Sequence, residues 1–446
     1  MLFFKIRFFL ITFVLLFSSY LVFGQTKNDP LPPYVPTEGS VAILTVENGG
    51  LANNFRDALS PYFNPWYGVK IRNDYSGAIS NPNIGVFGAV HYFGGGHRAS
   101  NENTLISAVP GEKSISFVRQ STATPYYGTE TDAKTCGLNS IGEANFQLDT
   151  TSGANTAGGV LRPPAIHSYQ IPVVTPDGFE LVFLAAINYT NDGGVASAWR
   201  LPITNTKDVF EWHRMGNDVV MTSIPHKENW QGSPIGAAQW SAPVYCVFVP
   251  AQNRIYIECN SFHEPKWFDR TSNKYVQGTG AKRPRAPNGY DGGCLLHIPS
   301  RSINVFLEST TGSNLRLHWM DVSKDQPSWN QTAVALSTSL TVTPSWSTAT
   351  WVPELNRIIL VGVKDDVKAY YEIEVPVKLE DSWTVTRRPW ASGILATAPQ
   401  SGVETWRDGG AWAWLPKIKS FVYLREALRA DQGGDQVYIC RPFGVK

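Results

Sequence analysis

A short pattern of strands and turns recurs along this chain of 446 residues. In each copy an apolar strand leads into a proline-marked tight turn, and a second apolar strand follows. The plainest copies are Asp291-Gly-Gly-Cys-Leu-Leu-His-Ile-Pro299 and Asp408-Gly-Gly-Ala-Trp-Ala-Trp-Leu-Pro416; Pro176, Pro250 and Pro353 mark the turn in three more. Self-similarity at intervals near the length of a four-stranded blade predicts an all-β fold, a β-propeller.

Period-two runs of apolar residues between turn signals divide the chain into six blades. The first is centred on Ala89–Phe93, with outer strands near 103–108 and 114–119. The predicted strands of the next five are 168–174, 179–186, 195–201 and 207–214; 244–249, 254–258, 265–271 and 274–278; 294–298, 303–308, 315–322 and 328–336; 348–352, 357–362, 368–375 and 382–388; and 411–415, 420–425 and 436–441. The Gly-, Ser- and Thr-rich stretch between 120 and 160 is either a long surface loop or a degenerate seventh blade.

The last predicted blade lacks a fourth strand. The segment Ser40–Val46 reads as a lone strand with no partner nearby in the sequence. We expect it to pair with the strand Gln436–Arg441 and so close the ring. Closure by the opposite terminus would remove an exposed sheet edge, which otherwise invites aggregation.

The N-terminus falls outside this pattern. Lys5 and Arg7 precede the apolar run Phe8–Phe23, and Gly24 ends it, which is typical of a secretory signal. An uncleaved membrane anchor is the alternative, but the run has only about 16 residues, whereas a span needs roughly 20. We expect a signal peptide at 1–24, a linker at 25–39 and a single propeller at 40–446. The mature protein would be secreted or on the cell surface, with no stable membrane span.

The charge balance limits the kinds of partner that the protein can bind, and the cysteine content limits the number of disulfides. Loss of Lys5 and Arg7 with the signal reduces the 38 basic residues to 36, against 37 acidic ones, which gives no electrostatic case for nucleic acid. Five cysteines in an exported chain permit up to two disulfides. Cys246 and Cys259 fall on successive predicted strands but not opposite each other, so we do not predict that pair.

Three sequence features together resemble a known family. Gly94-Gly-Gly-His-Arg-Ala-Ser-Asn-Glu-Asn103 follows a strand, Ile166-His-Ser-Tyr169 opens the next blade, and Trp212, Trp329 and Trp383 lie in predicted outermost strands. These features are similar to the kelch-type repeats of galactose-oxidase-like propellers. The similarity extends over nearly the whole mature chain, and it implies the propeller fold.

The resemblance does not extend to copper chemistry. Galactose oxidases hold copper with two tyrosines and two histidines and carry a cysteine-linked tyrosine, and this sequence has no Tyr-His dipeptide. Its eight histidines show no His-x-x-x-His spacing and its cysteines no Cys-x-x-Cys spacing. We therefore predict no metal and no cofactor.

Alternate turns of an up-and-down blade fall on opposite faces of the ring. The proline turns should crowd one face, and the loops before the first strand and after the second should crowd the other. The second face would gather the catalytic candidates His97, His167, Tyr169 and Arg407, and the ligand-binding candidates Arg98, Asn101, Asn103, Trp240, Asp291, Trp346, Trp406 and Asp408. Ligand sites of propellers commonly lie at such a channel mouth.

Each candidate also has a structural reading. Asp291 and Asp408 precede Gly-Gly and can cap turns through the backbone. His97 and His167 can hydrogen-bond neighbouring loops, and the tryptophans can pack between blades. Arg98 and Arg407 need a partner near the channel, which a carboxylate of the protein or a polar ligand can supply.

Three functions compete. The cluster of Trp, Tyr, Asn, Asp and Arg favours an exported module that binds a glycan or another extracellular polymer, because flat aromatic side chains stack on sugar rings. The second hypothesis is a polysaccharide lyase or hydrolase, with His97 or His167 as base and Tyr169 or Arg407 assisting. The third is a scaffold that binds a protein ligand. We expect binding, and the sequence leaves catalysis undecided, because the fold is compatible with all three.

Overall fold

The computed structural model describes residues 30–45, 77–93, 105–121, 147–149, 154–157, 160–162, 170–183, 197–215, 244–259, 264–284, 292–309, 314–341, 348–363, 366–393, 412–425 and 436–445. The chain divides into two compact units, Met1–Pro32 and Pro33–Lys446, and the fold belongs to the second. The predicted signal and all the predicted site residues lie outside the described ranges.

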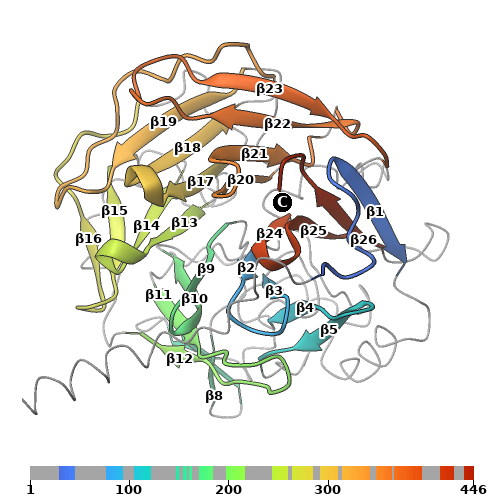
Figure 1. The fold of residues 1–446 in the computed structure, drawn as a ribbon. Helices are drawn as coiled ribbons and strands as arrows, with labels where there is room; N and C mark the ends of the chain where they lie inside the picture. Colours follow the sequence, from blue (N-terminus) through green and yellow to red (C-terminus); the bar gives the residue numbers. More distant parts are fainter. Residues whose placement is uncertain are drawn as a thin grey trace, which may run out of the picture. The chain divides into compact units, whose positions relative to one another are not determined.

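Six antiparallel sheets form a β-propeller, with the first strand of each blade nearest the axis (Figure 1). Blade 1 comprises β2 (Gly77–Asn81), β3 (Ala89–Phe93), β4 (Ile106–Pro110) and β5 (Ile115–Arg119). Blade 2 comprises β9 (Pro172–Thr175), β10 (Gly178–Phe183), β11 (Ser197–Leu201) and β12 (His213–Arg214). Blade 3 comprises β13 (Val244–Val249), β14 (Arg254–Cys259), β15 (Lys266–Asp269) and β16 (Lys274–Gln277).

The other three blades complete the ring. Blade 4 comprises β17 (Gly292–Ile298), β18 (Ile303–Ser309) and β19 (Arg316–Asp321). Blade 5 comprises β20 (Thr348–Val352), β21 (Arg357–Val361), β22 (Ala369–Glu374) and β23 (Thr384–Pro389). Blade 6 comprises β24 (Ala413–Leu415), β25 (Ser420–Arg425), β26 (Gln436–Arg441) and β1 (Ser40–Thr45). The predicted six-bladed propeller is thus confirmed.

The predicted closure of the ring is also confirmed. β1 forms the outermost strand of blade 6 and pairs with β26 in an antiparallel register from Ser40↔Arg441 to Thr45↔Gln436. The start of β1 also contacts the end of blade 5, because the N–H of Val41 donates to Ser392 at 2.9 Å. The N-terminal strand therefore joins the first and last parts of the chain.

The prediction for blade 1 missed one strand. We placed its centre on Ala89–Phe93, but the innermost strand is β2, Gly77–Asn81, and Ala89–Phe93 is the second strand. β2 was missed because Gly77-Ala-Ile-Ser-Asn81 is short and has a single bulky apolar residue. The stretch between 120 and 160 contributes the strands β6 (Gln147–Asp149) and β7 (Ala154–Ala157), which pair with β8 (Val160–Arg162) in a separate sheet.

The fourth strand of blade 4 is also not as predicted. Instead of a strand over 328–336, an isolated bridge joins Met320 to Trp329. The Asn330 side chain then replaces part of the ladder, since its Oδ1 accepts the N–H of Trp319 at 2.8 Å. A side chain thus satisfies a backbone donor that a regular fourth strand would otherwise pair.

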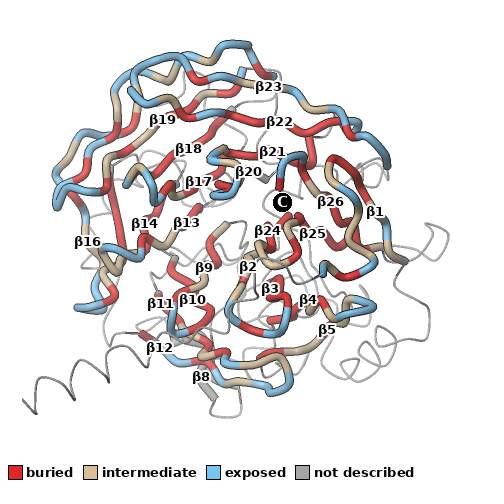
Figure 2. Tube along the Cα trace, viewed as in Figure 1, coloured by how far each residue is buried: buried red, intermediate tan, exposed pale blue. Residues whose placement is uncertain are grey.

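Large side chains fill the space between neighbouring blades. The outermost-strand tryptophans predicted from the sequence are buried, with 6% of Trp212, 3% of Trp329 and 0% of Trp383 exposed. Figure 2 shows the buried residues running along the inner strands of each blade. Burial of such aromatic rings supplies much of the hydrophobic contribution to stability.

Four of the proline turns share one backbone conformation. Pro250, Pro299 and Pro416 each begin a short 3₁₀ turn, and Pro353 begins a turn of the same length. Each ends in a left-handed residue with φ of 51° to 53°, namely Asn253, Ser302, Asn356 and Lys419. In each case the N–H of that residue returns to the proline carbonyl at 3.1 to 3.2 Å. The repeat seen in the sequence is therefore a repeat of local geometry.

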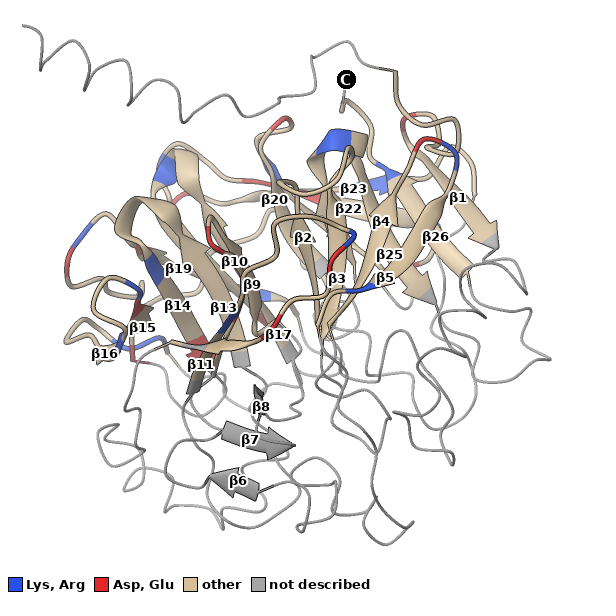
Figure 3. Cartoon of the chain, turned by 90° about the horizontal axis from the view of Figure 1, so that it is seen from below, with Lys and Arg blue, Asp and Glu red and all other residues tan. Residues whose placement is uncertain are grey.

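Buried ion pairs join blades 2, 3 and 4. The Arg270 guanidinium of blade 3 binds both oxygens of the buried Glu180 carboxylate of blade 2, at 2.9 and 2.7 Å. Arg283, which is 0% exposed, binds Glu258 of blade 3 and Glu308 of blade 4. On the outer strands acidic and basic residues are mixed (Figure 3). Among the described residues no helix is long and apolar enough to span a membrane.

Candidate functional site

Twelve site residues are expected from the sequence. His97, Arg98, Asn101, Asn103, His167, Tyr169, Trp240, Asp291, Trp346, Trp406, Arg407 and Asp408 all lie outside the described residues. Their convergence at a channel mouth therefore stays a prediction. The described residues instead define a cavity at the other end of the first strands, on the face of the proline turns.

This cavity is the axial channel of the propeller. Its volume is about 470 Å³, and residues from the first strand of all six blades line it. Pro82, Pro250, Pro299, Pro353 and Pro416 surround its mouth, which confirms that the turns between first and second strands gather on one face. The volume lies in the range of small-molecule sites.

The walls of the axial cavity are mainly apolar. Ile79 from blade 1, Val173 from blade 2 and Phe248 from blade 3 occupy one side, and Leu296, Trp351 and Trp414 from blades 4, 5 and 6 occupy the other. The two tryptophans are 9% and 7% exposed, so they support the wall more than they present a full ring face. The cavity is rigid because each wall residue belongs to a paired strand.

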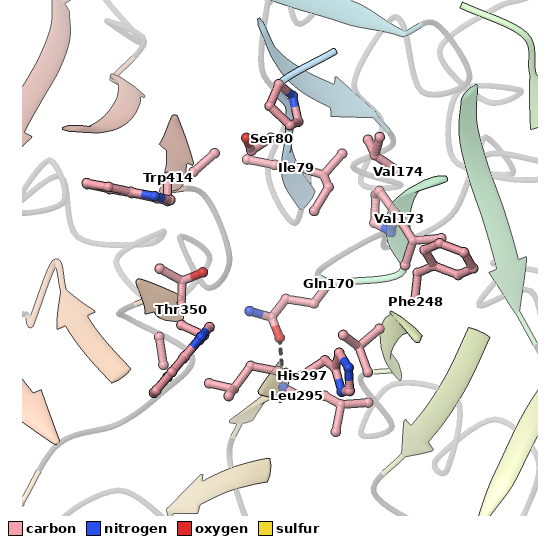
Figure 4. A pocket seen from close by; sticks show the side chains of 18 of the residues that line it. Ile79, Ser80, Gln170, Val173, Val174, Phe248, Leu295, His297, Thr350 and Trp414 are labelled. Atoms are coloured by element: carbon pink, nitrogen blue, oxygen red, sulfur yellow. Dashed lines mark hydrogen bonds between the residues drawn. The ribbon is translucent and has the colours of Figure 1, made fainter. Parts of the chain in front are cut away.

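Four polar side chains from four blades interrupt this apolar wall. They are Ser80 of blade 1, Gln170 before blade 2, His297 of blade 4 and Thr350 of blade 5. Figure 4 shows them around the same cavity, with Gln170 near its centre. A few polar groups converging in an apolar cavity fix the orientation of a bound molecule.

Gln170 is held by two neighbouring blades. Its carbonyl accepts the N–H of Cys246 in blade 3 at 2.8 Å. Its side chain reaches blade 4, where Oε1 accepts the N–H of Leu295 at 3.1 Å and Nε2 donates to the sulfur of Cys294 at 2.9 Å. The amide of Gln170 therefore lies across the inner edges of these blades.

These contacts follow from the free inner edge of each blade. N–H groups alternate along a strand, so those of Gly293, Leu295 and His297 point away from β18 and toward the axis. The hydroxyl of Tyr245 accepts the first at 2.6 Å, and Gln170 accepts the second. The N–H of His297 points toward the cavity that His297 lines.

The hydrogen bonds of His297, which lines the cavity, fix the tautomer of its imidazole ring. Its Nδ1 lies 3.1 Å from the carbonyl oxygen of Ile303 and 2.9 Å from Oδ1 of Asn304. Because a carbonyl can only accept, Nδ1 carries the proton and Nε2 keeps its lone pair. Burial lowers the pKa of His297, and the bonds to Asn304 and Ile303 only partly oppose that shift. The ring is therefore neutral at pH 7.

Formal charge is scarce in the cavity. Glu354 at the rim is the one acidic or basic side chain among the described lining residues. No group of three or more His, Cys, Asp and Glu that could hold a metal occurs within the described ranges. Cys246, Cys294 and Cys440 are buried thiols outside any disulfide, and burial raises the pKa of Cys294 to about 11.

Sequence reasoning missed this cavity. Gln170 and Thr350 belong to no motif, and they meet only because the ring brings distant segments together. The available signal was positional, since each of the four polar side chains lies on or just before a first strand that leads to a proline turn. That signal indicates the face of the propeller on which the cavity opens, but it does not indicate which side chains point toward the axis.

Comparisons with known proteins find only distant similarities. No protein-family model and no curated protein sequence matches this chain. Among solved structures, a luciferin-regenerating enzyme is 10% identical with a TM-score of 0.37, over 84% of this chain and 94% of the other. AofleA from Arthrobotrys oligospora is 11% identical with a TM-score of 0.37, over 93% and 90%.

A third similar structure is a lectin. The Aleuria aurantia lectin, solved in complex with α-methyl-L-fucoside, is 10% identical with a TM-score of 0.36, over 83% of this chain and 96% of the lectin. These similarities are too distant to carry over a site or a ligand. The kelch-type resemblance stays a prediction, because its glycine run lies outside the described residues.

Proposed function

We propose that this chain is an exported β-propeller that binds a glycan, and that the axial cavity receives one sugar unit of it. The supporting observation is the convergence of Ser80, Gln170, His297 and Thr350, from four blades, in a cavity of about 470 Å³. A sugar presents hydroxyls that both donate and accept, and this set offers both. The apolar wall between these groups matches the C–H faces of a sugar ring.

Export rests on the N-terminal sequence. Lys5, Arg7 and the run Phe8–Phe23 are the features of a cleaved signal. The rigid walls favour a binding role, since side chains on paired strands lose little conformational entropy when a ligand binds. The alternatives are a polysaccharide lyase or hydrolase, and a scaffold for a protein ligand.

The test is a glycan-array screen followed by calorimetry with the mature protein. In the Thr350→Val variant, affinity for a bound glycan should fall about 5- to 20-fold, because one hydrogen bond is lost. Thr384→Val is the matched control, since Thr384 is exposed on β23 of the same blade. Equal affinity in all three proteins would reject the cavity as the binding site.

The opposite face is tested in the same experiment. Arg407→Ala and Trp406→Ala change the residues predicted there from the sequence. If they abolish binding while Thr350→Val does not, the glycan site lies on that face. Product formation from a bound polysaccharide, lost in a His97→Ala or His167→Ala variant, would favour the enzyme hypothesis instead.

A further inference from the structure

The amide of Gln170 occupies the floor of the axial cavity. The described lining of each blade runs from the middle of the first strand to the proline turn, and Gln170 lies at the deep end with Leu295. Figure 4 shows its side chain extended across the cavity and hydrogen-bonded to Leu295. A molecule that enters between the prolines therefore meets this amide last among the described lining residues.

The orientation of the amide is fixed by its partners. The N–H of Leu295 can only donate, so the atom 3.1 Å from it must be Oε1. Nε2 then faces the sulfur of Cys294 at 2.9 Å. One hydrogen of Nε2 and one lone pair of Oε1 are used in these contacts, which leaves a second hydrogen and a second lone pair for a ligand.

The described groups around this amide are uncharged. Ser80 and Thr350 carry hydroxyls and His297 is neutral, and the described lining contains no lysine or arginine. A carboxylate that entered would lose its hydration without gaining a cation from the described lining, which is strongly unfavourable. A sugar hydroxyl in the same position would replace its hydrogen bonds to water with hydrogen bonds to the Gln170 amide and the His297 imidazole.

We propose that Gln170 determines the specificity of the cavity and that the ligand class is a neutral sugar, with acidic sugars excluded. This inference rests on the proposed function. Gln170 would donate from Nε2 to a sugar oxygen and accept a sugar hydroxyl at Oε1. Because the planar amide is already held by its two protein partners, it would form these two hydrogen bonds with little loss of side-chain entropy.

The binding test uses matched sugars. The probes are the methyl glycosides of glucose and glucuronic acid, and of galactose and galacturonic acid, since each pair differs only at C6. The wild-type protein should bind the better neutral sugar at least about 10-fold more tightly than its acid. Equal affinity for the two members, or tighter binding of the acid, would overturn the assigned ligand class.

Two variants test Gln170 itself. Gln170→Glu keeps the shape and the acceptor for Leu295 but loses the donor, and Gln170→Met keeps the volume without either group. Both should weaken binding of the neutral sugar about 10-fold or more, with Thr384→Val as the unchanged control. Circular dichroism and the melting temperature establish folding, and full affinity in a folded variant of either kind would overturn the role of Gln170.

A second readout does not depend on any sugar. Gln170 covers the thiol of Cys294, which is 0% exposed. Gln170→Ala should therefore speed the labelling of Cys294 by a small methanethiosulfonate at least about 10-fold, measured by peptide mass spectrometry. If no sugar binds the wild type, the proposed function fails, and labelling still decides whether Gln170 forms the floor. An unchanged rate would show that it does not.

Discussion

The ring of Phe443 lies directly over the backbone of Gly39. Gly39 has a φ of +73°, and a Cβ atom built on it would overlap the Phe443 ring. The N–H of Phe443 donates to the hydroxyl of Tyr370 in blade 5 at 2.9 Å. The residue before β1 and the residues after β26 thus close against each other beside the outer strands of blade 6.

Substitution of Gly39 should destabilise this closure. Gly39→Ala adds a Cβ that meets the Phe443 ring and places a side chain at positive φ, so we expect a loss of about 2–4 kcal/mol. Gly85→Ala is the matched control, because Gly85 has a φ of +67° but its nearest neighbour would be 3.4 Å away. Urea unfolding measures both, and equal losses would contradict the overlap.

Removal of the closing strand should cost more than removal of a tail. Deletion of residues 25–50 takes away β1 and leaves β26 with an unpaired edge, so the melting temperature should fall by roughly 10 °C or more. Deletion of residues 25–32 alone keeps Tyr34, whose hydroxyl donates to Gly111 at 2.8 Å. Calorimetry of the two proteins compares the effects, and an unchanged melting temperature in the longer deletion would refute the closure.

The six blades were predictable where apolar alternation and proline turns coincide. For blades 3 and 5 the predicted strand ends fall within two residues of the observed ones. The failures lie where side chains or glycines replace that signal, as in Gly77–Asn81 of blade 1 and at Asn330 of blade 4. Local patterns report strands with apolar faces, and they do not report where an asparagine side chain takes the place of a regular fourth strand.

The candidate site was less accessible to sequence reasoning. The proline turns predicted one crowded face correctly, but Gln170 and Leu295 are 125 residues apart and share no motif. Their contact exists because blade 2 and blade 4 present free inner edges to the same axis. Spacing rules detect ligands on one strand or helix, whereas this cavity draws single residues from each blade.

Burial of His91 makes stability depend on pH. His91 is 0% exposed and burial lowers its pKa to about 3, whereas an unfolded histidine titrates near 6.5. Between these values the unfolded chain binds more protons, so the free energy of unfolding should fall as pH falls from about 6.5 to about 3. The loss should be on the order of 2–4 kcal/mol.

The His91→Phe variant isolates this effect. The ring stays beside Phe179, which His91 meets edge-on at 5.7 Å, but the titrating group is gone. Urea unfolding at several pH values should then give a flatter dependence over this range, whatever the absolute stability. His213→Gln, at an exposed position, should leave the slope as in the wild type. An unchanged slope in His91→Phe would reject this origin.

The buried ion pair between blades 2 and 3 should contribute far more to the free energy of unfolding than an exposed ion pair does. Arg270→Met takes the bidentate partner from the Glu180 carboxylate, which is 0% exposed, and leaves it only Arg200 Nε at 3.0 Å as an ion-pair partner, so we expect a loss of about 3 kcal/mol. Arg387→Met removes a bidentate bond to Asp366 at 2.6 and 2.7 Å from an arginine that is 46% exposed. That loss should be at most about 1 kcal/mol, and similar losses for both would contradict the argument.

Metal removal should have no effect on the fold or on glycan binding. The histidine and cysteine spacing predicts no metal site, although ligands brought together from distant blades would escape a spacing rule. Elemental analysis of dialysed protein should find less than one equivalent of copper, zinc or calcium. A retained equivalent would raise the enzyme hypothesis above the binding one.

The pairing of β1 with β26 sets the order in which the molecule can be completed. Thr45 and Gln436 are register partners, so β1, which leaves the ribosome early, must wait for nearly the last strand. Until then blade 6 lacks its outermost strand and β1 has no partner. Contacts between segments so far apart in the sequence form slowly. A nascent chain of this kind depends on being kept from aggregation until its C-terminus arrives, and every premature stop yields an open ring.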